Sequence, residues 1–226
     1  MISTIKLLNK LRNMPLFTLN DLSLITKKSR DYLKVYINRL LKKDLIYKIE
    51  RGKFTVHDNP IIFASSLIIP SYFSLWTALA HYHLTTQIPL EIFVIVKNKK
   101  KPIQFQGKKI NFIQSHIFGY RKEYYGGIQI FVAEKEKLFI DCIHTNLIPL
   151  NQLDELIEDI NIQKTFTYLK RTKNKNLAKR IGFLLEEKKK KANKILSLID
   201  ANYTPFIKGK KARGRKNKKW KVIDNR

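Results

Sequence analysis

Residues 18–42 read TLNDLSLITKKSRDYLKVYINRLLK and contain the signals of two helices joined by a short polar turn. Thr18 is a candidate N-cap for a helix over residues 19–25, and Ser29 is a candidate N-cap for a second helix. A hydroxyl side chain at this position accepts a hydrogen bond from the first helical turn. The second helix has an apolar stripe at helical spacing, made by Leu33, Tyr36, Ile37, Leu40 and Leu41. Its other face is polar and basic, and we expect that face to be exposed.

The flanking segments complete a known order of elements. Residues 2–12 have the apolar periodicity of an amphipathic helix, which Pro15 ends. Residues 45–49 and 54–56 are predicted strands, and Gly52 suits the turn between them because that turn needs a positive φ. Three helices and a hairpin are the order of a winged helix-turn-helix, whose third helix enters the major groove of DNA.

Candidate DNA contacts lie on the turn, the third helix and the hairpin. The basic residues expected to contact phosphates are Lys27, Lys28, Arg30, Lys34, Arg51 and Lys53. Arg30, Tyr32 and Asn38 are the candidates for reading base edges, because Arg pairs with guanine and Asn with adenine in the major groove. Ser29, at the start of the third helix, is the remaining candidate DNA-binding residue. The alternative is a winged helix that contacts only protein, and the positive charge of this cluster favours DNA.

The chain as a whole is strongly basic. Its 226 residues include 45 Lys and Arg against 18 Asp and Glu, which gives a formal net charge of +27 and predicts an acidic partner. A hydrophobic fraction of 44% is enough for packed cores, and the length suits two domains. The single cysteine excludes a disulfide framework and fits a cytoplasmic protein. Because no apolar run reaches the length of a membrane span, we expect no membrane partner.

Residues 61–204 predict a second, α+β domain. Ser71 is a candidate N-cap for its first helix, and residues 91–96 form a near-continuous apolar run, which is typical of a central strand. Further short strands are expected over residues 102–105, 109–113 and 128–132. Helices dominate afterwards, over residues 134–145, 150–160, 166–173 and 177–198. The predicted fold class is therefore α+β: an N-terminal winged helix-turn-helix over residues 1–58, an α+β domain and a basic tail.

Two further basic clusters follow. The helices between residues 170 and 194 predict a second positive surface, to which belong Lys170, Arg171, Lys173, Lys175, Lys179 and Arg180. Nine of the fourteen residues from 208 to 221 are Lys or Arg, so we expect residues 205–226 to form a disordered cationic tail. Such a tail would bind nucleic acid without sequence preference, through Lys210, Lys211, Arg213, Arg215 and Lys216.

Signals of catalysis are weak. Outside residues 154–159, the densest carboxylate group is Glu134, Glu136 and Asp141, which could hold Mg²⁺ and gives a metal-dependent nuclease as an alternative function. The neighbouring lysines favour ordinary ion pairing instead. The histidines lack zinc spacing, the glycines match no phosphate loop, and Cys142 lies among apolar residues as a buried cysteine would. The sequence therefore predicts a protein that is not an enzyme and uses no metal or cofactor.

Several ordered motifs between about residues 15 and 190 resemble the AbiEi family, the antitoxins and transcriptional regulators of bacterial and archaeal phage-defence operons. The motifs are IERGKF at 49–54, YFSLWTALA at 72–80 followed by QIP at 87–89, FGY at 118–120, EKEKLFID at 134–141 and KRIGFLL at 179–185. The resemblance implies that a winged helix represses the operon by binding inverted repeats. It also implies that the C-terminal domain counters a nucleotidyltransferase toxin without requiring a stable complex.

For this sequence, the resemblance implies that residues 29–42 and 51–53 read DNA. It also implies that the motifs at residues 134–141 and 179–185 maintain the structure of the C-terminal domain and are not active sites. The basic helices near residues 170–194 are then expected to meet toxin, RNA or nucleotide. The leading prediction is a DNA-binding antitoxin that represses its own toxin–antitoxin operon. The alternatives are a stand-alone winged-helix regulator without a toxin and the metal-dependent nuclease.

Overall fold

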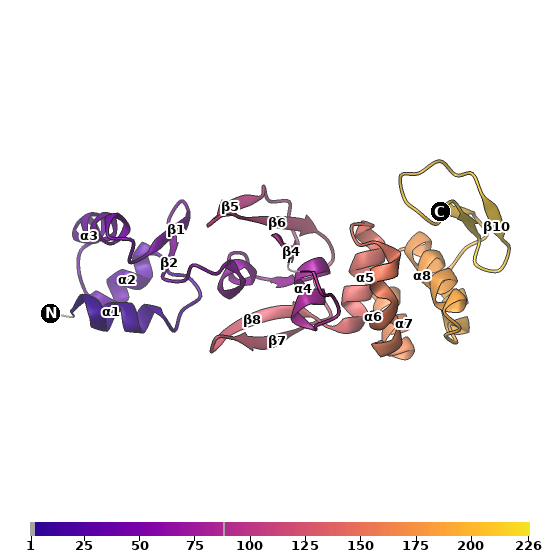
Figure 1. Cartoon of the computed structure of the whole chain (residues 1–226), viewed down its shortest axis with the longest axis horizontal. Coiled ribbons are helices and arrows are strands. Elements are labelled where there is room, and N and C mark those ends of the chain that lie inside the picture. Colours follow the sequence, from indigo (N-terminus) through magenta and orange to yellow (C-terminus); the bar gives the residue numbers. More distant parts are fainter. Residues whose placement is uncertain (1–2, 88) are drawn as a thin grey trace. The chain divides into compact units, whose positions relative to one another are not determined.

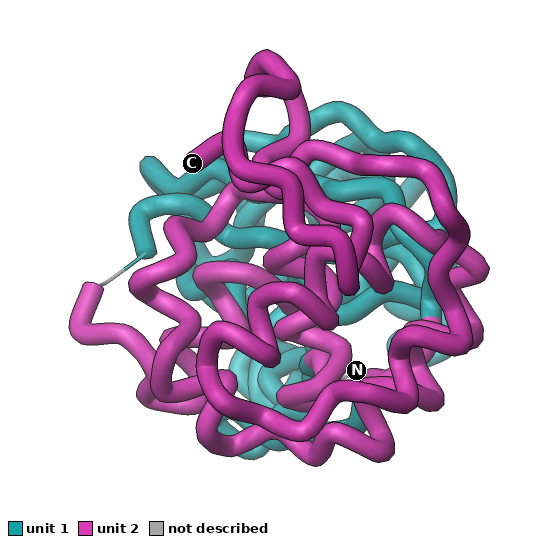
Figure 2. Tube along the Cα trace, turned by 90° about the vertical axis from the view of Figure 1, so that its right-hand side faces the viewer, with its two compact units in different colours: residues 1–73, 89–117, 121–132 teal, residues 74–88, 118–120, 133–226 magenta. Residues whose placement is uncertain are grey.

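The structure is a computed structural model that describes residues 3–87 and 89–226, and it is α+β, as predicted (Figure 1). Its contacts divide the chain into two compact units (Figure 2). Unit 1 comprises residues 1–73, 89–117 and 121–132, and unit 2 comprises residues 74–88, 118–120 and 133–226. Unit 1 thus includes the first hairpin together with later segments of the chain that this hairpin contacts. No helix in the described part of the chain is both long and apolar enough to cross a membrane.

Unit 1 begins with three capped helices, which are α1 (Thr4–Leu11), α2 (Leu19–Thr26) and α3 (Arg30–Lys42). Thr18 caps α2 in a reciprocal capping box with Asp21, and Ser29 caps α3 by accepting a hydrogen bond from the backbone of Tyr32. Both predicted caps are confirmed. Ser3, which the sequence analysis did not single out, caps α1, whose predicted start at residue 2 lies outside the described residues.

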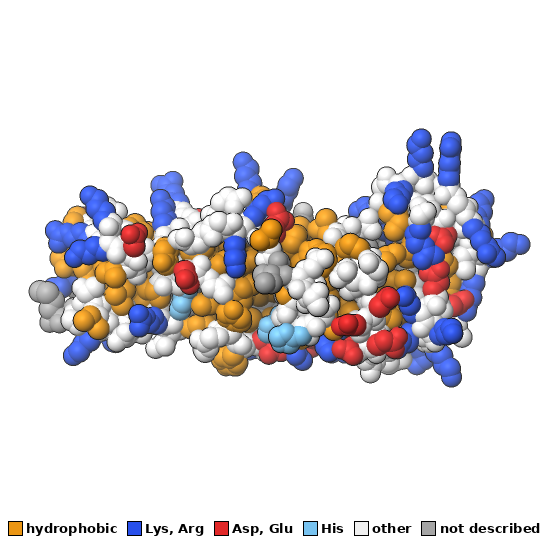
Figure 3. Space-filling view, viewed as in Figure 1, with side chains coloured by type: hydrophobic (Ala, Val, Ile, Leu, Met, Phe, Trp, Pro, Cys, Tyr) orange, Lys and Arg blue, Asp and Glu red, His pale blue; other side chains and the backbone are white. Residues whose placement is uncertain are grey.

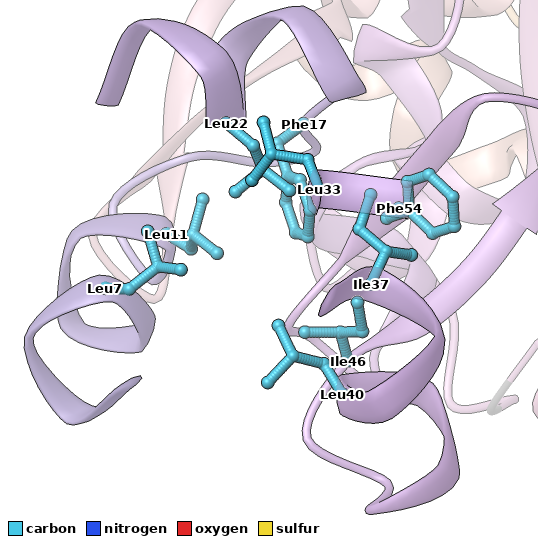
Figure 4. Close-up of a cluster of buried hydrophobic side chains, with 9 residues drawn as sticks. All are labelled: Leu7, Leu11, Phe17, Leu22, Leu33, Ile37, Leu40, Ile46 and Phe54. Atoms are coloured by element: carbon cyan, nitrogen blue, oxygen red, sulfur yellow. The ribbon is translucent and has the colours of Figure 1, made fainter. Parts of the chain in front are cut away.

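A two-stranded antiparallel hairpin follows, formed by β1 (Tyr47–Glu50) and β2 (Lys53–Thr55). Backbone hydrogen bonds of 2.8 and 2.9 Å join Phe17 to Phe54 and so tie the loop before α2 to the hairpin. Side chains from all three helices and the hairpin converge on one core, as Figure 4 shows for Leu7, Leu11, Phe17, Leu22, Leu33, Ile37, Leu40, Ile46 and Phe54. The predicted apolar stripe of α3 is thus the stripe that is buried.

After two short 3₁₀ turns at residues 60–62 and 64–66, the chain enters a mixed six-stranded sheet of order β5-β6-β4-β3-β8-β7. Its strands are β3 (Ser71–Phe73), β4 (Glu91–Val96), β5 (Ile103–Phe105), β6 (Lys108–Gln114), β7 (Tyr120–Tyr125) and β8 (Ile128–Ala133). β4 pairs in parallel with β6 and antiparallel with β3. The interior position predicted for residues 91–96 is confirmed.

The prediction that Ser71 caps a helix is wrong. Ser71 lies in β3, and the helix α4 (Leu75–His81) starts four positions later. Segments distant in sequence determine this strand, because Ser71 is opposite Val96 of β4 and Phe73 is opposite Val132 of β8. The local helical periodicity gives way to these pairings. The strand β7 was also missed.

Unit 2 is built around the helix α5 (Lys135–Thr145), in which residues 136–143 are all buried. α5 contacts α4, α6 (Asp154–Asp159), α7 (Ile162–Thr172) and α8 (Lys175–Glu187). A 3₁₀ turn at residues 150–153 precedes α6, and another covers residues 193–198. The predicted helix over residues 177–198 is therefore shorter, and it ends near Lys189, whose φ of +58° lies outside the helical region.

The prediction of a disordered tail is wrong. Residues 204–226 form a three-stranded sheet of order β10-β11-β9, whose strands are β9 (Thr204–Pro205), β10 (Arg215–Asn217) and β11 (Val222–Asp224). Trp220 and Val222 are fully buried, and β9 and β11 contact α8. Burial of these apolar side chains orders a segment whose composition alone indicates disorder.

Candidate nucleic-acid interface

The turn between α2 and α3 presents a short run of exposed polar and basic residues. Lys27 ends α2 in the left-handed conformation, with a φ of +55°, and its N–H donates to the carbonyl of Ser23. Lys28 and Arg30 are exposed on either side of the Ser29 cap. The Ser29 hydroxyl is engaged in that cap, so its first role is to position the start of α3.

The outer face of α3 carries the other predicted residues. Arg30, Lys34 and Asn38 are exposed and recur every four residues, so they form one row along the helix. An Arg30 guanidinium nitrogen donates to Asn20 of α2 at 2.5 Å, a contact that the sequence analysis missed. Lys34 pairs with Asp31 at 2.9 Å on the open surface, where such a pair contributes little. The structure therefore places the predicted residues Arg30, Lys34 and Asn38 of α3 in one exposed row, without Tyr32.

Tyr32 lies on another side of α3, next to Tyr36 and Lys28. The residue is 45% exposed, its ring stacks on Tyr36 at a centroid distance of 6.0 Å, and the Lys28 ammonium lies 5.8 Å from the Tyr32 ring centroid. The hydroxyl of Tyr36 is hydrogen-bonded to Thr4 of α1 at 2.9 Å. Tyr32 is thus held against Tyr36, which is itself tied to α1, and it remains partly exposed to solvent.

The hairpin presents one of its two predicted DNA contacts to solvent. Arg51 is exposed in the turn, whereas Lys53 donates to the Leu67 carbonyl at 2.6 Å and pairs with Glu50 at 3.1 Å. Glu50 also pairs with Lys100 at 2.6 Å. Contrary to expectation, Lys53 ties the hairpin to the rest of unit 1, because the carbonyl that it binds belongs to Leu67, outside the hairpin.

This tie predicts a pH-dependent contribution to stability. Burial raises the pKa of Glu50, but hydrogen bonds from Lys100 and Lys53 outweigh burial and hold the pKa below the ordinary value of 4.5. A carboxylate with a lowered pKa stabilises the folded state above its unfolded pKa, and this contribution is lost as the pH falls through the folded pKa. We expect Glu50→Gln to lower the free energy of unfolding by about 1 kcal/mol or less at pH 7, because the group is partly exposed. Urea denaturation at several pH values measures this loss.

The loss should shrink as the pH falls below 4.5. Asp31→Asn is the control, since it removes the same charge from an exposed pair on α3 and should change the free energy of unfolding by less than about 0.5 kcal/mol. A loss in Glu50→Gln that stayed constant down to pH 3 would contradict this account.

The second predicted basic surface is only partly a surface. Lys170, Arg171, Lys173 and Lys175 are exposed, but Lys179 and Arg180 are buried in unit 2. Lys179 pairs with Asp200 and donates to the Asn202 carbonyl at 2.5 Å, and the Arg180 Nε donates to the Pro205 carbonyl at 3.0 Å. Burial lowers the pKa of Arg180. These two residues hold the C-terminal segment against α8, so their assignment to a binding surface is corrected.

The basic residues of the C-terminal segment are exposed, but on an ordered loop. Lys210, Lys211, Arg213, Arg215 and Lys216 all face solvent in the segment from β9 to β10. The Asn225 side chain accepts from the N–H of Ile207 at 2.7 Å and donates to the carbonyls of Ile207 and Lys211 at 3.1 Å. Gly214 has a φ of +155°, and a Cβ there would lie 1.7 Å from the Asp224 carbonyl oxygen, so only glycine fits.

The three acidic residues of the nuclease alternative are all engaged in ion pairs with lysines. Glu134 accepts from the Tyr168 hydroxyl and pairs with Lys164, and Glu136 also pairs with Lys164, at 3.3 Å. The buried Asp141 pairs instead with Lys137. Within residues 3–87 and 89–226, no three His, Cys, Asp or Glu side chains are grouped so that they could hold a metal ion.

Cys142, next to Asp141 on α5, is 1% exposed. Burial raises the pKa of its thiol well above the ordinary value, and the charge of Asp141 raises it further, while Lys137 acts in the opposite direction. A raised pKa keeps the thiol protonated and weakly nucleophilic. The expectation of a buried cysteine is confirmed.

Comparison with known proteins shows that the fold of this chain resembles that of a solved structure. No protein-family model matches the chain, and no curated protein matches it. Among solved structures, the Rv2827c protein from Mycobacterium tuberculosis aligns with a TM-score of 0.64 and 12% sequence identity, over 100% of this chain and 92% of that chain. At this identity the likeness concerns the fold alone. The chain therefore has an α+β fold that is shared, over its whole length, with the mycobacterial protein.

Proposed function

We propose that the first 58 residues are a winged helix-turn-helix domain that binds duplex DNA through α3, and that the chain represses its own operon as a non-catalytic antitoxin of AbiEi type. The observation that carries the DNA-binding part is the exposed row of Arg30, Lys34 and Asn38 on a helix that is anchored in the three-helix core through Leu33, Ile37 and Leu40. A guanidinium and an amide on one exposed helix face are suited to base edges in the major groove.

The charge around this row supports the proposal. Lys27, Lys28 and Arg51 are exposed on the turn before α3 and on the hairpin. Figure 3 shows Lys and Arg side chains gathered over the N-terminal helices. Phosphate contacts of this kind hold a protein on the duplex without reading sequence, and their contribution falls with salt.

The antitoxin part of the proposal rests on the AbiEi-like motifs. Two of them lie in α5 and α8, where most of their side chains are buried, so they maintain the fold of unit 2. The exposed residues Lys170, Arg171, Lys173 and Lys175 offer a surface to the nucleotidyltransferase toxin or to its RNA, without a requirement for a stable complex. We further propose that the protein acts in the cytoplasm.

The test is a titration of the full chain against duplex DNA from its own upstream region and against a shuffled duplex of equal length, at two salt concentrations. A preference of about a thousandfold for the native sequence that persists at the higher salt would support a specific repressor. Equal binding to both duplexes, lost together as salt rises, would overturn it. A neighbouring reading frame without a nucleotidyltransferase motif would restrict the proposal to a stand-alone regulator.

At residue level, Arg30→Ala is expected to weaken binding to the native duplex by about 1–3 kcal/mol, or roughly 5- to 150-fold. The loss should be much smaller on the shuffled duplex, because a base contact carries sequence information that a phosphate contact does not. Fluorescence anisotropy with both duplexes measures the two losses.

The matched control is Lys10→Ala, which removes one positive charge from the last turn of α1. It should weaken binding to both duplexes slightly and equally. If Arg30→Ala reduced binding to both duplexes by the same factor, Arg30 would be a phosphate contact and its role in base reading would be excluded.

A further inference from the structure

The C-terminal sheet of unit 2 carries an exposed aromatic ring between two lysines. Tyr203, just before β9, is 37% exposed. The ammonium groups of Lys216 on β10 and Lys221 before β11 lie 5.4 and 5.5 Å from its ring centroid. Residues from three parts of the C-terminal segment thus surround one ring.

The alternation of the strands explains why these side chains share a face. Thr204 and Val222 are buried and opposite each other in register, so they face α8. Tyr203 adjoins the buried Thr204 and therefore points to the opposite, outer face. Lys221 lies in the turn before β11, with a φ of +54°, and its ammonium reaches the same ring. Lys216 lies opposite Ile223 of β11, which belongs to the same outer face. The sheet register thus brings Lys216 to the face of the Tyr203 ring, and the turn before β11 brings Lys221 there.

The charge around the ring is unbalanced. No acidic residue occurs between Asp200 and Asp224. Lys219 pairs with Glu186, and Arg226 pairs with Glu187 and Asp224. Within the described chain, no ion pair is formed by the remaining basic residues after Asp200, which are Lys208, Lys210, Lys211, Arg213, Arg215, Lys216, Lys218 and Lys221. Figure 3 shows long basic side chains projecting from this part of the molecule.

The loop that carries these charges is held in place. Trp220 is fully buried, its indole N–H donates to Glu186 at 2.9 Å, and its backbone N–H donates to the Asn217 side chain at 2.8 Å. The Asn225 side chain fastens the other end of the loop through Ile207 and Lys211. The positive surface is therefore organised before any ligand arrives, which lowers the entropic cost of binding.

We propose that this surface binds an unpaired nucleotide strand, with one base stacked on Tyr203 and the neighbouring phosphates on Lys216, Lys221 and the basic loop. Base stacking on an aromatic side chain is worth about 5- to 150-fold in affinity. An exposed contact between a lysine and an aromatic ring is worth only about two- to fivefold, so a base displaces the lysines toward the phosphates.

The exposed ring selects against duplex DNA at this site. In a duplex each base face is covered by its neighbours, whereas an unpaired base can stack on the ring. The basic loop alone would bind any polyanion, so the aromatic ring is the feature that makes the site specific for unpaired strands. This inference does not rest on the proposed function, because no residue of α3 takes part.

The test measures binding of the full chain to fluorescein-labelled single strands of about twelve nucleotides, a length within the range of single-strand binding sites, at roughly physiological salt. The strands are oligothymidylate, oligouridylate and an abasic strand of equal length. Tyr203→Ala is expected to weaken binding to the first two by about tenfold, to the level of the abasic strand, while Tyr203→Phe binds as the wild type does. Tyr124→Ala is the control and should leave binding unchanged, since Tyr124 is a 70% exposed tyrosine on β7 of unit 1. The ratio of the wild-type affinities for oligouridylate and oligothymidylate shows whether the site prefers RNA or DNA.

A second variant tests the phosphate contacts. The double change Lys216→Gln with Lys221→Gln should reduce the slope of log affinity against log salt by about 1.4, because each phosphate that a lysine neutralises on a single strand contributes about 0.7. The proposal is overturned if the wild type binds the abasic strand as tightly as oligothymidylate, or if Tyr203→Ala binds as tightly as the wild type. Should Tyr203→Ala melt below the wild type, Tyr203→Leu replaces it, because leucine preserves the apolar contacts of the ring but offers no stacking face. Binding of Tyr203→Leu equal to the wild type would also overturn the proposal.

Discussion

Gly182→Ala is expected to displace Trp220 and to lower the free energy of unfolding of unit 2 by about 3 kcal/mol or more. A Cβ at Gly182 of α8 would lie 2.0 Å from Cζ3 of Trp220, which is well inside van der Waals contact. The indole cannot yield, because it is fully buried and hydrogen-bonded to Glu186. Urea denaturation followed by circular dichroism measures the loss, and Trp fluorescence reports exposure of the indole.

The control for this prediction removes the ring. Trp220→Leu is itself destabilising, but in that background Gly182→Ala should cost nothing or should stabilise by up to about 1 kcal/mol, because alanine is the better helix former. The two changes therefore couple strongly, as residues in direct contact do. An equal loss from Gly182→Ala in both backgrounds would show that the contact with Trp220 is not what requires glycine.

The pair of Gly182 and Trp220 illustrates why the C-terminal segment was not predicted from the sequence. Nine basic residues between 208 and 221 indicate a solvated tail by composition. The surface that orders it belongs to α8, which precedes it in the chain, and its fit depends on the missing side chain of Gly182. The apolar residues at 220, 222 and 223 were the available signal of an ordered segment. The helix on which they pack, α8, is distant in the sequence, so the signal could not be recognised locally.

The N-terminal helices were predicted well because their determinants are local. Thr18 and Ser29 cap helices through the backbone three residues ahead, and the apolar spacing of α3 repeats within one helix. The strand β3 was missed for the opposite reason, since Ser71 and Phe73 take their conformation from partners in β4 and β8. Local signals predict an element, whereas sheet pairing overrides them.

The same contrast holds for the candidate binding residues. Asn38 is exposed as expected, because the helical period that buries Leu33 turns it away from the core, and Arg30 is exposed in the first turn of α3, beside the buried stripe. Lys53 and Lys179 were expected to be exposed, yet each is held by a backbone carbonyl elsewhere in its own unit. Sequence reasoning places every lysine of a basic chain on the surface. Only the folded structure shows which lysines bind backbone carbonyls and so stabilise the fold.

Asp141→Ala is expected to destabilise unit 2 by about 3–5 kcal/mol. The side chains of Asp141 and Lys137 pair within α5 and are each 1% exposed, and the Ser74 hydroxyl donates to Asp141 at 3.0 Å. The Lys137 ammonium also lies 4.9 Å from the Phe118 ring centroid. Removal of the carboxylate leaves the ammonium buried without its counter-charge, and this is far more costly than the pair itself is stabilising. Thermal and urea unfolding of the variant measure the loss.

The double change Lys137→Met with Asp141→Leu separates the structural role of Asp141 from a catalytic one. Replacing both charges with apolar groups of similar volume should recover most of the stability, because no unpaired charge is left in the interior. A metal ligand would behave differently: its loss would abolish Mg²⁺-dependent cleavage of plasmid DNA in every variant that lacks the carboxylate, however stable. Recovery of stability in the double variant, together with unchanged plasmid DNA for the wild type and the variant alike, is the outcome that the buried pair predicts. Cleavage by the wild type that disappears in the stable double variant would instead assign Asp141 to a nuclease site and contradict the structural role.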